Sequence, residues 1–277
     1  LPGRVFLITG GTQGLGYHTA LALFRRGAHV VVTGRDEERG ARAIRELQQA
    51  RTGSLRAAGE GGAPDELAHN REGRVEFLQL DLANLRQVYT AAQAFINRKL
   101  PLHGLINNAA QMVVPFGLTD DGYVLQFGVN VIGHYYLTQK LLPILMATAA
   151  ATTSPSDVRV VNLGSEAMNS PYGGGVGIRL AGNQLNEPTG YDGFRAYGQS
   201  KLGVYLMSKI LTAQLAELAD LKVLVNTVHP GFVENGALTL DGKTFGLPFR
   251  WFLKAIYPLF STKVEYGVLN TVYVATA

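Results

Sequence analysis

A glycine-rich turn between a short apolar run and a helical stretch constrains this chain more than any other feature. The apolar run Val5–Ile8 leads into Thr9-Gly10-Gly11-Thr12-Gln13-Gly14-Leu15-Gly16, after which Ala20, Leu23 and Phe24 share one helix face. A buried strand that turns directly into a helix presents backbone N–H groups and a positive dipole end, which attract phosphate. Glycines permit the bend and leave no Cβ in the way of a pyrophosphate. The spacing Gly-x3-Gly-x-Gly is not the commonest dinucleotide fingerprint, so the turn alone also fits an ordinary α/β protein.

Short apolar strands alternate with longer helical stretches along the chain, which predicts βαβ units and a parallel sheet. Strands are expected at Val5–Ile8, Ala28–Thr33, Val75–Leu80, Gly104–Asn107, Val158–Leu163 and Val223–Val228. Helices are expected near 15–26, 36–50, 84–98, 120–148 and 194–219, with a further helix-like stretch at 263–275. Right-handed crossovers place helices on both faces, so the predicted fold class is α/β, a doubly wound parallel sheet. Residues 1–277 are expected to form a single domain, with a surface insertion at about 51–74, where periodicity is lost.

Composition excludes several classes of function. With 277 residues, 47% of them hydrophobic and 17% charged, the chain is globular with a large core. The net charge of +4 comes from Lys and Arg spread along the chain, so no nucleic-acid partner is expected. There is no cysteine and no local cluster of histidines, so no metal site is expected. No apolar run reaches about 18 residues, so no membrane span is expected, while a targeting or anchoring segment upstream of Leu1 is left open.

The end of the second predicted strand bears on the choice of cofactor. An acid that binds the adenosine ribose is expected about 20 residues after the glycines, but 19 residues after Gly16 the chain has Arg35. Arginine can pair with a 2′-phosphate, whereas an acid would repel one. Asp36 follows, but neighbouring side chains diverge, so only one of the two faces the ribose. NADP(H) is therefore favoured over NAD(H), unless Arg35 faces solvent and the choice lies elsewhere.

Further motifs occur in a fixed order after the glycine turn. They are Asp81-Leu82, Asn107-Asn108-Ala109-Ala110, Asn130, Ser165 and Tyr197-x3-Lys201. Together with Thr9–Gly16 they resemble the short-chain dehydrogenase/reductase superfamily, over nearly the whole chain. His229-Pro230-Gly231 and the residues around Ser165 and Tyr197 resemble its retinol-dehydrogenase-like branch, which includes the WW-domain oxidoreductase, member X of the group, chloroplast translocon-associated members and, more distantly, the protochlorophyllide reductases. The resemblance implies a Rossmann-type fold.

Tyr197 and Lys201 lie four positions apart, so they share one face of a helix. Carbonyl reduction needs a proton for the developing alkoxide, and the reverse reaction needs a base. A tyrosine titrates at about 10, too high for a base at neutral pH. The neighbouring ammonium and an oxidised nicotinamide are expected to lower that pKa. Tyr197 is thus the predicted proton donor and acceptor, with Lys201 its electrostatic partner and, as the resemblance implies, a ligand of the nicotinamide ribose.

Two further residues complete the predicted catalytic set. Ser165 follows the fifth predicted strand, at the carboxyl edge where doubly wound sheets bind ligands. Its hydroxyl can hydrogen-bond a substrate carbonyl, and capping a turn is the alternative role. Asn130 lies within the helical stretch 120–148, where asparagine is a poor former. By resemblance it holds a water that links the lysine to solvent, and simple packing is the alternative.

The cofactor-binding residues are carried over from the resemblance. They are Gly10, Thr12, Gln13, Gly14, Leu15, Gly16, Arg35, Asp81, Leu82, Asn108, Ala109, Tyr197, Lys201, Pro230, Gly231, Val233 and Asn235. The resemblance implies that Asp81 meets the adenine amino group, Ala109 lines the adenosine ribose and the Val233 backbone meets the carboxamide. Asn107 is expected to brace the sheet. The chain departs from the usual pattern with Ala110 in place of glycine and Asn235 in place of threonine.

Two segments are expected to shape the substrate site. Residues 166–193 form a long loop between Ser165 and Tyr197. The second segment, at about 232–263, contains 245–260, which carries the only tryptophan and a dense set of aromatic residues. Three interpretations of 245–260 are open. The segment can form an apolar lid over the site, lie against a membrane surface, or be an ordinary packed helix and turn. A lid predicts a lipophilic alcohol, aldehyde or ketone as substrate.

The resulting prediction is an NADP(H)-dependent oxidoreductase that interconverts a carbonyl and an alcohol on a retinoid, sterol, prenol or similar molecule. Two alternatives are kept, a reductase of carbon–carbon double bonds and a low-turnover NADPH-binding redox sensor. The residues 120–148 and 194–219 are those that pair subunits in this superfamily, so a homodimer is an open expectation. An intracellular location is expected, with the cytoplasm, the endoplasmic reticulum and other organelle membranes left open.

Overall fold

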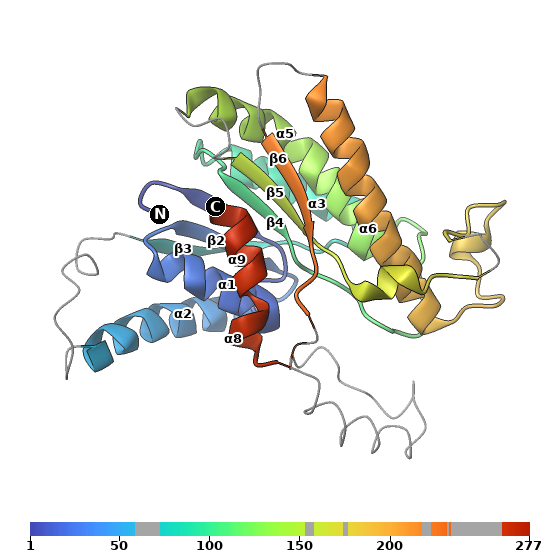
Figure 1. Ribbon diagram of the computed structural model, residues 1–277, viewed down its shortest axis with the longest axis horizontal. Coiled ribbons are helices and arrows are strands. Elements are labelled where there is room, and N and C mark those ends of the chain that lie inside the picture. Colours follow the sequence, from blue (N-terminus) through green and yellow to red (C-terminus); the bar gives the residue numbers. More distant parts are fainter. Residues whose placement is uncertain (59–72, 153–157, 174–176, 218–222, 232, 234–261) are drawn as a thin grey trace, which may run out of the picture.

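Six parallel strands form one sheet in the order β3-β2-β1-β4-β5-β6 (Figure 1). The structure is a computed structural model that describes residues 1–58, 73–152, 158–173, 177–217, 223–231, 233 and 262–277. The strands are β1 Val5–Ile8, β2 His29–Gly34, β3 Arg74–Gln79, β4 Gly104–Asn107, β5 Val158–Leu163 and β6 Val223–Val228. All six predicted strands are confirmed, with β2 and β3 each displaced by one residue. The order reverses between β1 and β4, which is where ligands bind in sheets of this kind.

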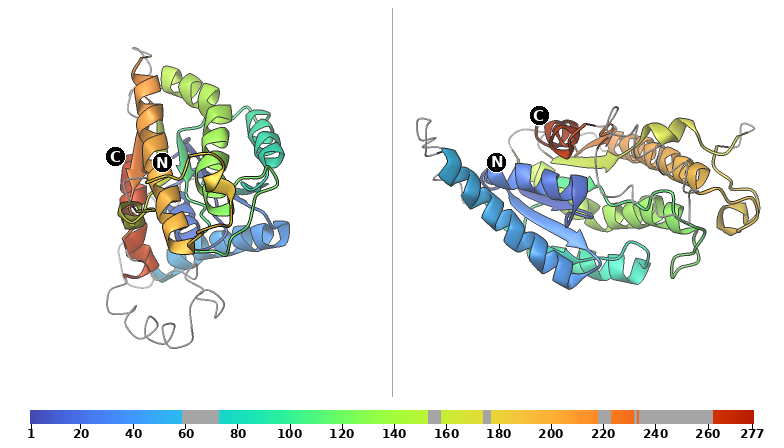
Figure 2. Two further views of the ribbon diagram at one scale, coloured as in Figure 1. Left: turned by 90° about the vertical axis from the view of Figure 1, so that its right-hand side faces the viewer. Right: turned by 90° about the horizontal axis from the view of Figure 1, so that it is seen from below.

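Helices cover both faces of the sheet (Figure 2). They are α1 Gly14–Arg25, α2 Glu37–Ala58, α3 Leu85–Ile96, α4 Leu125–Phe127, the π-helix η1 Gly128–Gly133, α5 His134–Ala151, the 3₁₀ turns η2 Glu166–Asn169 and η3 Gln184–Asn186, α6 Gly193–Ala216, α8 Val264–Gly267 and α9 Leu269–Thr276. The hydrophobic core beneath α3, α5 and α6 is separate from the core beneath α1, α2 and α9. The predicted class, a doubly wound α/β sheet, is therefore confirmed. None of the described helices is both long and apolar enough to span a bilayer.

The central strands are buried on both faces, which explains their uninterrupted apolar sequence. Every residue of β1, β4 and β5 is buried. Leu7 pairs with Val31 on one side and with Leu105 on the other, and all three are buried in the same core. Parallel strands need this two-sided cover, and such strands read as continuous hydrophobic runs.

Two sequence-based expectations about helices were wrong. The single helix predicted over 120–148 begins only at Leu125, because 118–124 form a tight reversal. Leu118 bridges Val124 in antiparallel fashion and Gly122 has a φ of +81°, a conformation that glycine adopts readily. The helix expected near 36–50 continues as α2 to Ala58, into the stretch 51–74 that was expected to be a surface insertion. Residues 59–72 of that insertion lie outside the described residues.

Side-chain caps set where the helices near the sheet edge begin. Asp36 Oδ1 accepts a 2.9 Å hydrogen bond from Arg39 N at the start of α2, and Asn84 Oδ1 accepts one of 2.9 Å from Gln87 N in α3. Asp192 Oδ1 accepts a 2.7 Å bond from Arg195 N at the start of α6. Each bond satisfies a backbone donor that the helix itself cannot pair.

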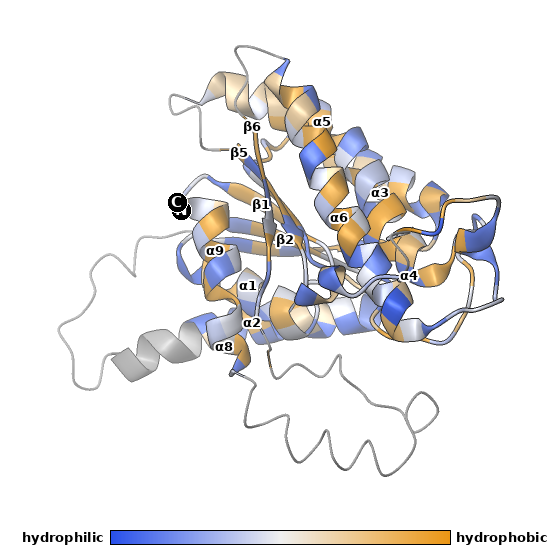
Figure 3. Cartoon of the chain, turned by 45° about the vertical axis from the view of Figure 1, so that its right-hand side comes forward, coloured by the Kyte–Doolittle hydropathy of each residue, from blue (hydrophilic) through white to orange (hydrophobic). Residues whose placement is uncertain are grey.

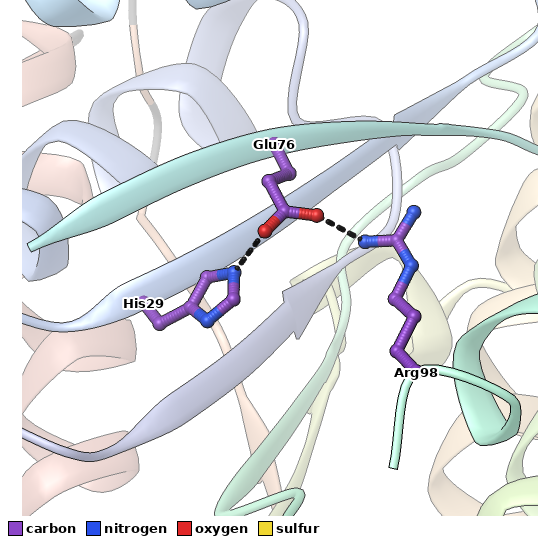
Figure 4. A network of polar contacts seen from close by, with 3 residues as sticks. All are labelled: His29, Glu76 and Arg98. Atoms are coloured by element: carbon purple, nitrogen blue, oxygen red, sulfur yellow. Dashed lines mark hydrogen bonds and ion pairs between the residues drawn. The ribbon is translucent and has the colours of Figure 1, made fainter. Parts of the chain in front are cut away.

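A charged network joins β2, β3 and the end of α3 (Figure 4). Glu76 Oε2 lies 2.7 Å from Arg98 Nη1, and its Oε1 lies 2.8 Å from His29 Nε2. The His29 contact is close enough for an ion pair when the imidazole is protonated, although it is not aligned as a hydrogen bond. His29 is the first residue of β2, so the network lies at the edge of the sheet opposite the carboxyl ends of the strands.

Candidate functional site

The glycine turn after β1 is shaped so that side chains are excluded from it. Gly10 and Gly14 have φ values of +64° and +55°, which other residues rarely adopt. A Cβ on Gly16 would lie 2.3 Å from Gly10 O and 2.5 Å from Asn108 Nδ2. Gln13 precedes α1 in an extended conformation, and the first turn of that helix carries no acidic residue. The turn therefore offers bare backbone and a helix N-terminus, the arrangement that binds phosphate.

Thr9 and Asn108 join the glycine turn to the end of β4. Asn108 Nδ2 donates hydrogen bonds of 2.8 Å to Thr9 O and 3.3 Å to Gly10 O. The backbone amides of Asn108 and Ala109 each donate a 2.9 Å bond to Thr9 Oγ1. The side chain of Asn108 is thus engaged in holding the turn.

At the end of β2, Arg35 and Asp36 have different surroundings. The carboxylate of Asp36 caps α2, as described above, whereas the exposed Arg35 is held through its backbone carbonyl, which accepts a 3.0 Å bond from Gln79 Nε2. Arg39 Nη1 donates a 3.4 Å bond to Gln13 Oε1 in the glycine turn. The guanidinium of Arg39 therefore reaches the glycine turn, a contact that the sequence had not indicated.

Residues at the ends of β3 and β4 are held by local contacts. Asp81 Oδ1 accepts a 2.9 Å bond from Ala83 N, and Leu82 is buried. Asn107 Nδ2 donates bonds of 2.7 Å to Asn162 Oδ1 on β5 and 3.1 Å to Thr138 Oγ1 on α5. These contacts make Asn107 a brace between neighbouring strands, as the sequence had indicated.

Ser165, Tyr197 and Lys201 lie together beyond the end of β5. The hydroxyl of Ser165 lies close enough to the Tyr197 phenol to influence its pKa, and Lys201 Nζ is 5.6 Å from the centre of the Tyr197 ring. Lys201 Nζ also donates a 2.6 Å bond to the carbonyl of Leu163, the last residue of β5. Ser165 caps η2 as well, since its Oγ accepts a 3.2 Å bond from Ala167 N. Because the cap uses Ser165 Oγ only as an acceptor, the hydroxyl hydrogen is left to donate, so capping η2 does not exclude a hydrogen bond to a substrate.

Burial dominates the ionisation of the tyrosine and the lysine. It raises the pKa of Tyr197, and the hydrogen bond with Ser165 opposes that rise to a smaller extent. Burial lowers the pKa of Lys201 to about 8, because the ammonium loses its hydration. The expected lowering of the Tyr197 pKa relied on Lys201 together with an oxidised nicotinamide. In the protein alone the pKa is raised instead, because burying a phenolate is costly.

Asn130 lies in the π-helix η1, and its side chain reaches two other segments. Its Oδ1 accepts a 2.8 Å bond from Gln111 N, and its Nδ2 donates bonds of 2.9 Å to Gln111 O and 2.9 Å to Ser200 Oγ. Ser200 precedes Lys201 on α6. Asn130 therefore ties the loop after β4 to the helix that carries Tyr197 and Lys201.

The segment after β6 lies beside the glycine turn. Gly231 has a φ of +83° and follows Pro230 at the end of β6. A Cβ on Gly267 of α8 would lie 2.3 Å from Val233 Cγ2 and 3.3 Å from Leu15 Cδ2, so Val233 and Leu15 meet at this glycine. Asn235 and the aromatic segment 245–260 lie outside the described residues.

Sequence reasoning missed three buried or bridging groups near this edge. Thr9 was read only as part of a motif, whereas its hydroxyl joins the turn to β4. His134 is four positions after Asn130, a spacing that could have indicated contact on one helix face. Gln126 is fully buried, and its Oε1 accepts a 2.8 Å bond from Val113 N while its Nε2 donates one of 2.8 Å to Tyr191 Oη. No local pattern pointed to Gln126.

Chemically, this edge of the sheet combines a turn of bare backbone amides with a protonated phenol, a serine hydroxyl and a buried amine. A phenol hydrogen-bonded to a hydroxyl can donate a proton to an oxygen placed near both groups. The amine can stabilise the phenolate that remains. Such a set suits reactions in which an oxygen atom gains or loses a proton.

Comparisons with known proteins point in the same direction. Residues 4–177 match the family model for short chain dehydrogenase. The chain is 37% identical to a polyprenol dehydrogenase from Danio rerio over 99% of this chain and 74% of that protein. It is 33% identical to retinol dehydrogenase 14 from Mus musculus over 99% of this chain and 73% of that protein. The structure resembles the Pseudomonas aeruginosa RhlG/NADP active-site complex, with a TM-score of 0.67, 23% identity and coverage of 100% of this chain and 91% of that one.

Proposed function

The chain belongs to the short-chain dehydrogenase/reductase family of oxidoreductases, and we propose that it interconverts a carbonyl and an alcohol on a lipophilic small molecule with NADP(H). One observation carries this proposal. Tyr197 lies beside Ser165 and one helical turn from the buried Lys201, which is anchored to the Leu163 carbonyl at the edge of the sheet where the glycine turn lies. A proton donor is thus held beside a site suited to a dinucleotide.

The residues present fit a nicotinamide dinucleotide. A Cβ at Gly16 would occupy the space between the turn and Asn108, so the cradle requires glycine there. The diphosphate would lie on the backbone of Gly14 to Gly16 at the start of α1, and the nicotinamide end would lie toward Tyr197 and Lys201. Asp81, Ala109 and the segment Pro230 to Val233 would line the remainder. When bound, the cofactor would supply or take up the hydride.

The preference for NADP(H) rests on the charges at the end of β2. Asp36 uses its carboxylate to cap α2, and the side chain of Arg35 is exposed beside it. Arg39 reaches Gln13 from the first turn of α2. Two guanidinium groups at this position would attract a 2′-phosphate, and the carboxylate of Asp36 is engaged in capping α2.

The chain's own groups would divide the proton chemistry between them. In the direction of reduction, Ser165 would donate a hydrogen bond to the substrate carbonyl oxygen, and Tyr197 would transfer its phenolic proton to that oxygen. Lys201 would stabilise the phenolate that remains. Asn130 would hold the water that links Lys201 to solvent, through which Tyr197 regains its proton. In the direction of oxidation the same groups act in reverse.

The substrate is proposed to be lipophilic for two reasons. The relatives include enzymes named for polyprenol and retinol, both long apolar alcohols. In this chain Phe194, three positions before Tyr197, is 51% exposed, and Leu180 in the preceding loop is 67% exposed. These exposed apolar side chains lie in or next to the segment between Ser165 and Tyr197 that is expected to shape the substrate site.

Association through α5 and α6 is proposed as well. Tyr135 on α5 and Tyr205, Leu206 and Ile210 on α6 are between 39% and 54% exposed. Figure 3 shows orange, hydrophobic stretches along both helices. A homodimer would cover these residues, and light scattering coupled to size exclusion would detect twice the chain mass of 29.8 kDa. The expected membrane contact through 245–260 stays a proposal without structural support.

A panel of carbonyl substrates tests the proposed function. All-trans-retinal, a polyprenal and a short aldehyde should be supplied with NADPH and NADH in parallel. We expect NADPH-dependent formation of the alcohol, faster with the two long substrates than with the short one. Tight NADPH binding with no alcohol formed would contradict the proposed activity, and reduction of a carbon–carbon double bond instead would appear in product analysis.

A further inference from the structure

His134 lies between the glycine turn and Asn130. It is the first residue of α5, immediately after the π-helix, and only 2% of it is exposed. Its Nε2 is 2.8 Å from Thr9 Oγ1 in the turn after β1. Its Nδ1 is 3.0 Å from the backbone oxygen of Asn130. The imidazole therefore bridges two parts of the site that are 121 positions apart in sequence, Thr9 and Asn130.

The proton positions on this bridge follow from its partners. A backbone carbonyl can only accept, so Nδ1 must carry the hydrogen that points to Asn130 O. The Nε2 lone pair then accepts the hydroxyl hydrogen of Thr9. An alternative acceptor for that hydroxyl, Ile106 O, is 3.5 Å away compared with 2.8 Å for His134 Nε2. The oxygen of Thr9 is left to accept from the amides of Asn108 and Ala109.

The surroundings keep the imidazole neutral. The ring is fully buried, and the positive charge of Lys201 on α6 faces it. Burial, with a smaller contribution from Lys201, lowers the pKa of His134 to about 4, although its hydrogen bond with Asn130 opposes the shift. A neutral ring has one donor and one acceptor, and both are used.

The bridge continues toward the catalytic helix. Asn130 Nδ2 donates a 2.9 Å bond to Ser200 Oγ, and Ser200 Oγ donates a 2.7 Å bond to the backbone oxygen of Tyr197. The connected groups thus run from the amides after β4 through Thr9, His134, Asn130 and Ser200 to Tyr197. Each donor and acceptor along this path is buried or partly buried, where hydrogen bonds hold their geometry more firmly than in water.

We propose that His134 is a positioning residue that fixes the Asn130 carbonyl relative to the glycine turn, so that cofactor binding at the turn and the arrangement of the catalytic helix are coupled. This inference rests on the proposed function. It requires His134 to act through Thr9 and Asn130 without touching substrate or cofactor. Breaking the bridge should therefore change both NADPH affinity and turnover.

Four single variants and the double variant Thr9→Val/His134→Asn of the full chain test the coupling. His134→Asn keeps a donor near the Nδ1 position and loses the reach to Thr9, while Thr9→Val removes the hydroxyl and Thr9→Ser keeps it. Thr138→Val is the matched control, because Thr138 is buried one turn further along α5 and accepts its bond from Asn107. NADPH affinity would be measured by fluorescence titration, turnover with the best carbonyl substrate, and stability by thermal unfolding.

We expect His134→Asn and Thr9→Val each to weaken NADPH binding and to lower kcat by roughly tenfold, the size expected for a lost buried hydrogen bond. Because Thr9→Val also removes the acceptor of the Asn108 and Ala109 amides, the double variant should be no worse than Thr9→Val alone, and Thr9→Ser should restore most of both properties. Thr138→Val should lose thermal stability only. Additive effects of Thr9→Val and His134→Asn, or variants that behave like Thr138→Val, would overturn the coupling.

A second measurement does not depend on any variant folding. The ring nitrogens of His134 in the wild-type protein should show the Nδ1–H tautomer by nitrogen-15 spectroscopy at neutral pH, and an Nε2–H tautomer would overturn the bridge. The measurements also distinguish failure of the proposed function from failure of the coupling through His134. Wild-type protein that binds neither NADPH nor NADH would refute the proposed function together with the coupling. Active wild-type protein with normal variants would refute the coupling alone.

Discussion

The ammonium of Lys201 lies 5.6 Å from the centre of the Tyr197 ring, one turn further along the same helix. Both side chains are buried, and Lys201 is anchored to the Leu163 carbonyl at the end of β5. Burial raises the pKa of the tyrosine and lowers that of the lysine to about 8, so it moves apart two values that are similar in water. The phenol therefore keeps its proton at neutral pH, as a proton donor must.

The pKa of Lys201 predicts how activity varies with pH. Burial lowers it to about 8, so the amine is charged below that pH and loses its charge as the pH rises through it. If the ammonium is needed, kcat/KM should be constant below pH 8 and fall above it. Lys201→Arg, whose side chain stays charged, should be slower at pH 7 and should not show the fall. A wild-type profile that is flat from pH 7 to 10 would refute the requirement.

Arg35 is predicted to set the cofactor preference. Arg35→Ala should raise the KM for NADPH roughly 10- to 100-fold, the worth of a charge-assisted hydrogen bond, and leave the KM for NADH nearly unchanged. Arg42→Ala, also exposed on α2 but further along that helix, is the control. Equal losses with both cofactors would assign the 2′-phosphate to another group, and Arg39 would be the next candidate.

Gly16 is predicted to tolerate no side chain. In Gly16→Ala the new Cβ would lie 2.3 Å from Gly10 O, a backbone atom that cannot move away cheaply. We expect the free energy of unfolding to fall by about 1–3 kcal/mol, as for other overpacked sites, and NADPH binding to be lost. Gly173→Ala, where a Cβ meets nothing within 4 Å, should change neither. NADPH bound by Gly16→Ala with wild-type affinity would argue against the cradle.

The buried His134 predicts a loss of stability in acid. Its pKa is lowered from 6.5 to about 4 in the folded protein, so above pH 6.5 the ring is neutral in both states and its contribution is complete. As the pH falls from 6.5 to 4, the unfolded chain binds a proton that the folded protein does not, so folding is destabilised, by about 3 kcal/mol at most.

Denaturant unfolding between pH 4.5 and 7.5 tests this contribution. The free energy of unfolding should fall more steeply toward acid for the wild type than for His134→Asn, because asparagine does not titrate. The difference between the two curves removes the contribution of carboxylates that both proteins share. Parallel curves would show that His134 titrates similarly in the folded and unfolded states.

The sequence predicted the sheet well because its strands are buried on both faces. Four of the six strands begin and end where the apolar runs do, for example Val158–Leu163. The helix expected over 120–148 was begun too early, because local propensity does not show the tight reversal at Gly122 that precedes α4. The continuation of α2 to Ala58 was missed because residues 51–58 carry little hydrophobic pattern.

The candidate site could be predicted only where spacing along the chain reflects contact. Tyr197 and Lys201 are neighbours on one helix, so their spacing placed them together. The contacts of Thr9 with His134 and of Gln126 with Tyr191 join residues that are 125 and 65 positions apart. Such contacts depend on how the strands and loops pack, and no local pattern encodes them. The direction of the Tyr197 pKa shift was likewise missed, because burial is a property of the fold.

The most direct test of the account concerns the phenolic hydroxyl of Tyr197. Tyr197→Phe removes that single oxygen and keeps the ring in place, so NADPH affinity measured by fluorescence titration should stay within a few-fold of wild type. Carbonyl reduction by the same preparation should fall by at least roughly 100-fold, as expected when a general acid is removed. Wild-type rates of alcohol formation in Tyr197→Phe, with cofactor bound normally, would contradict the central claim.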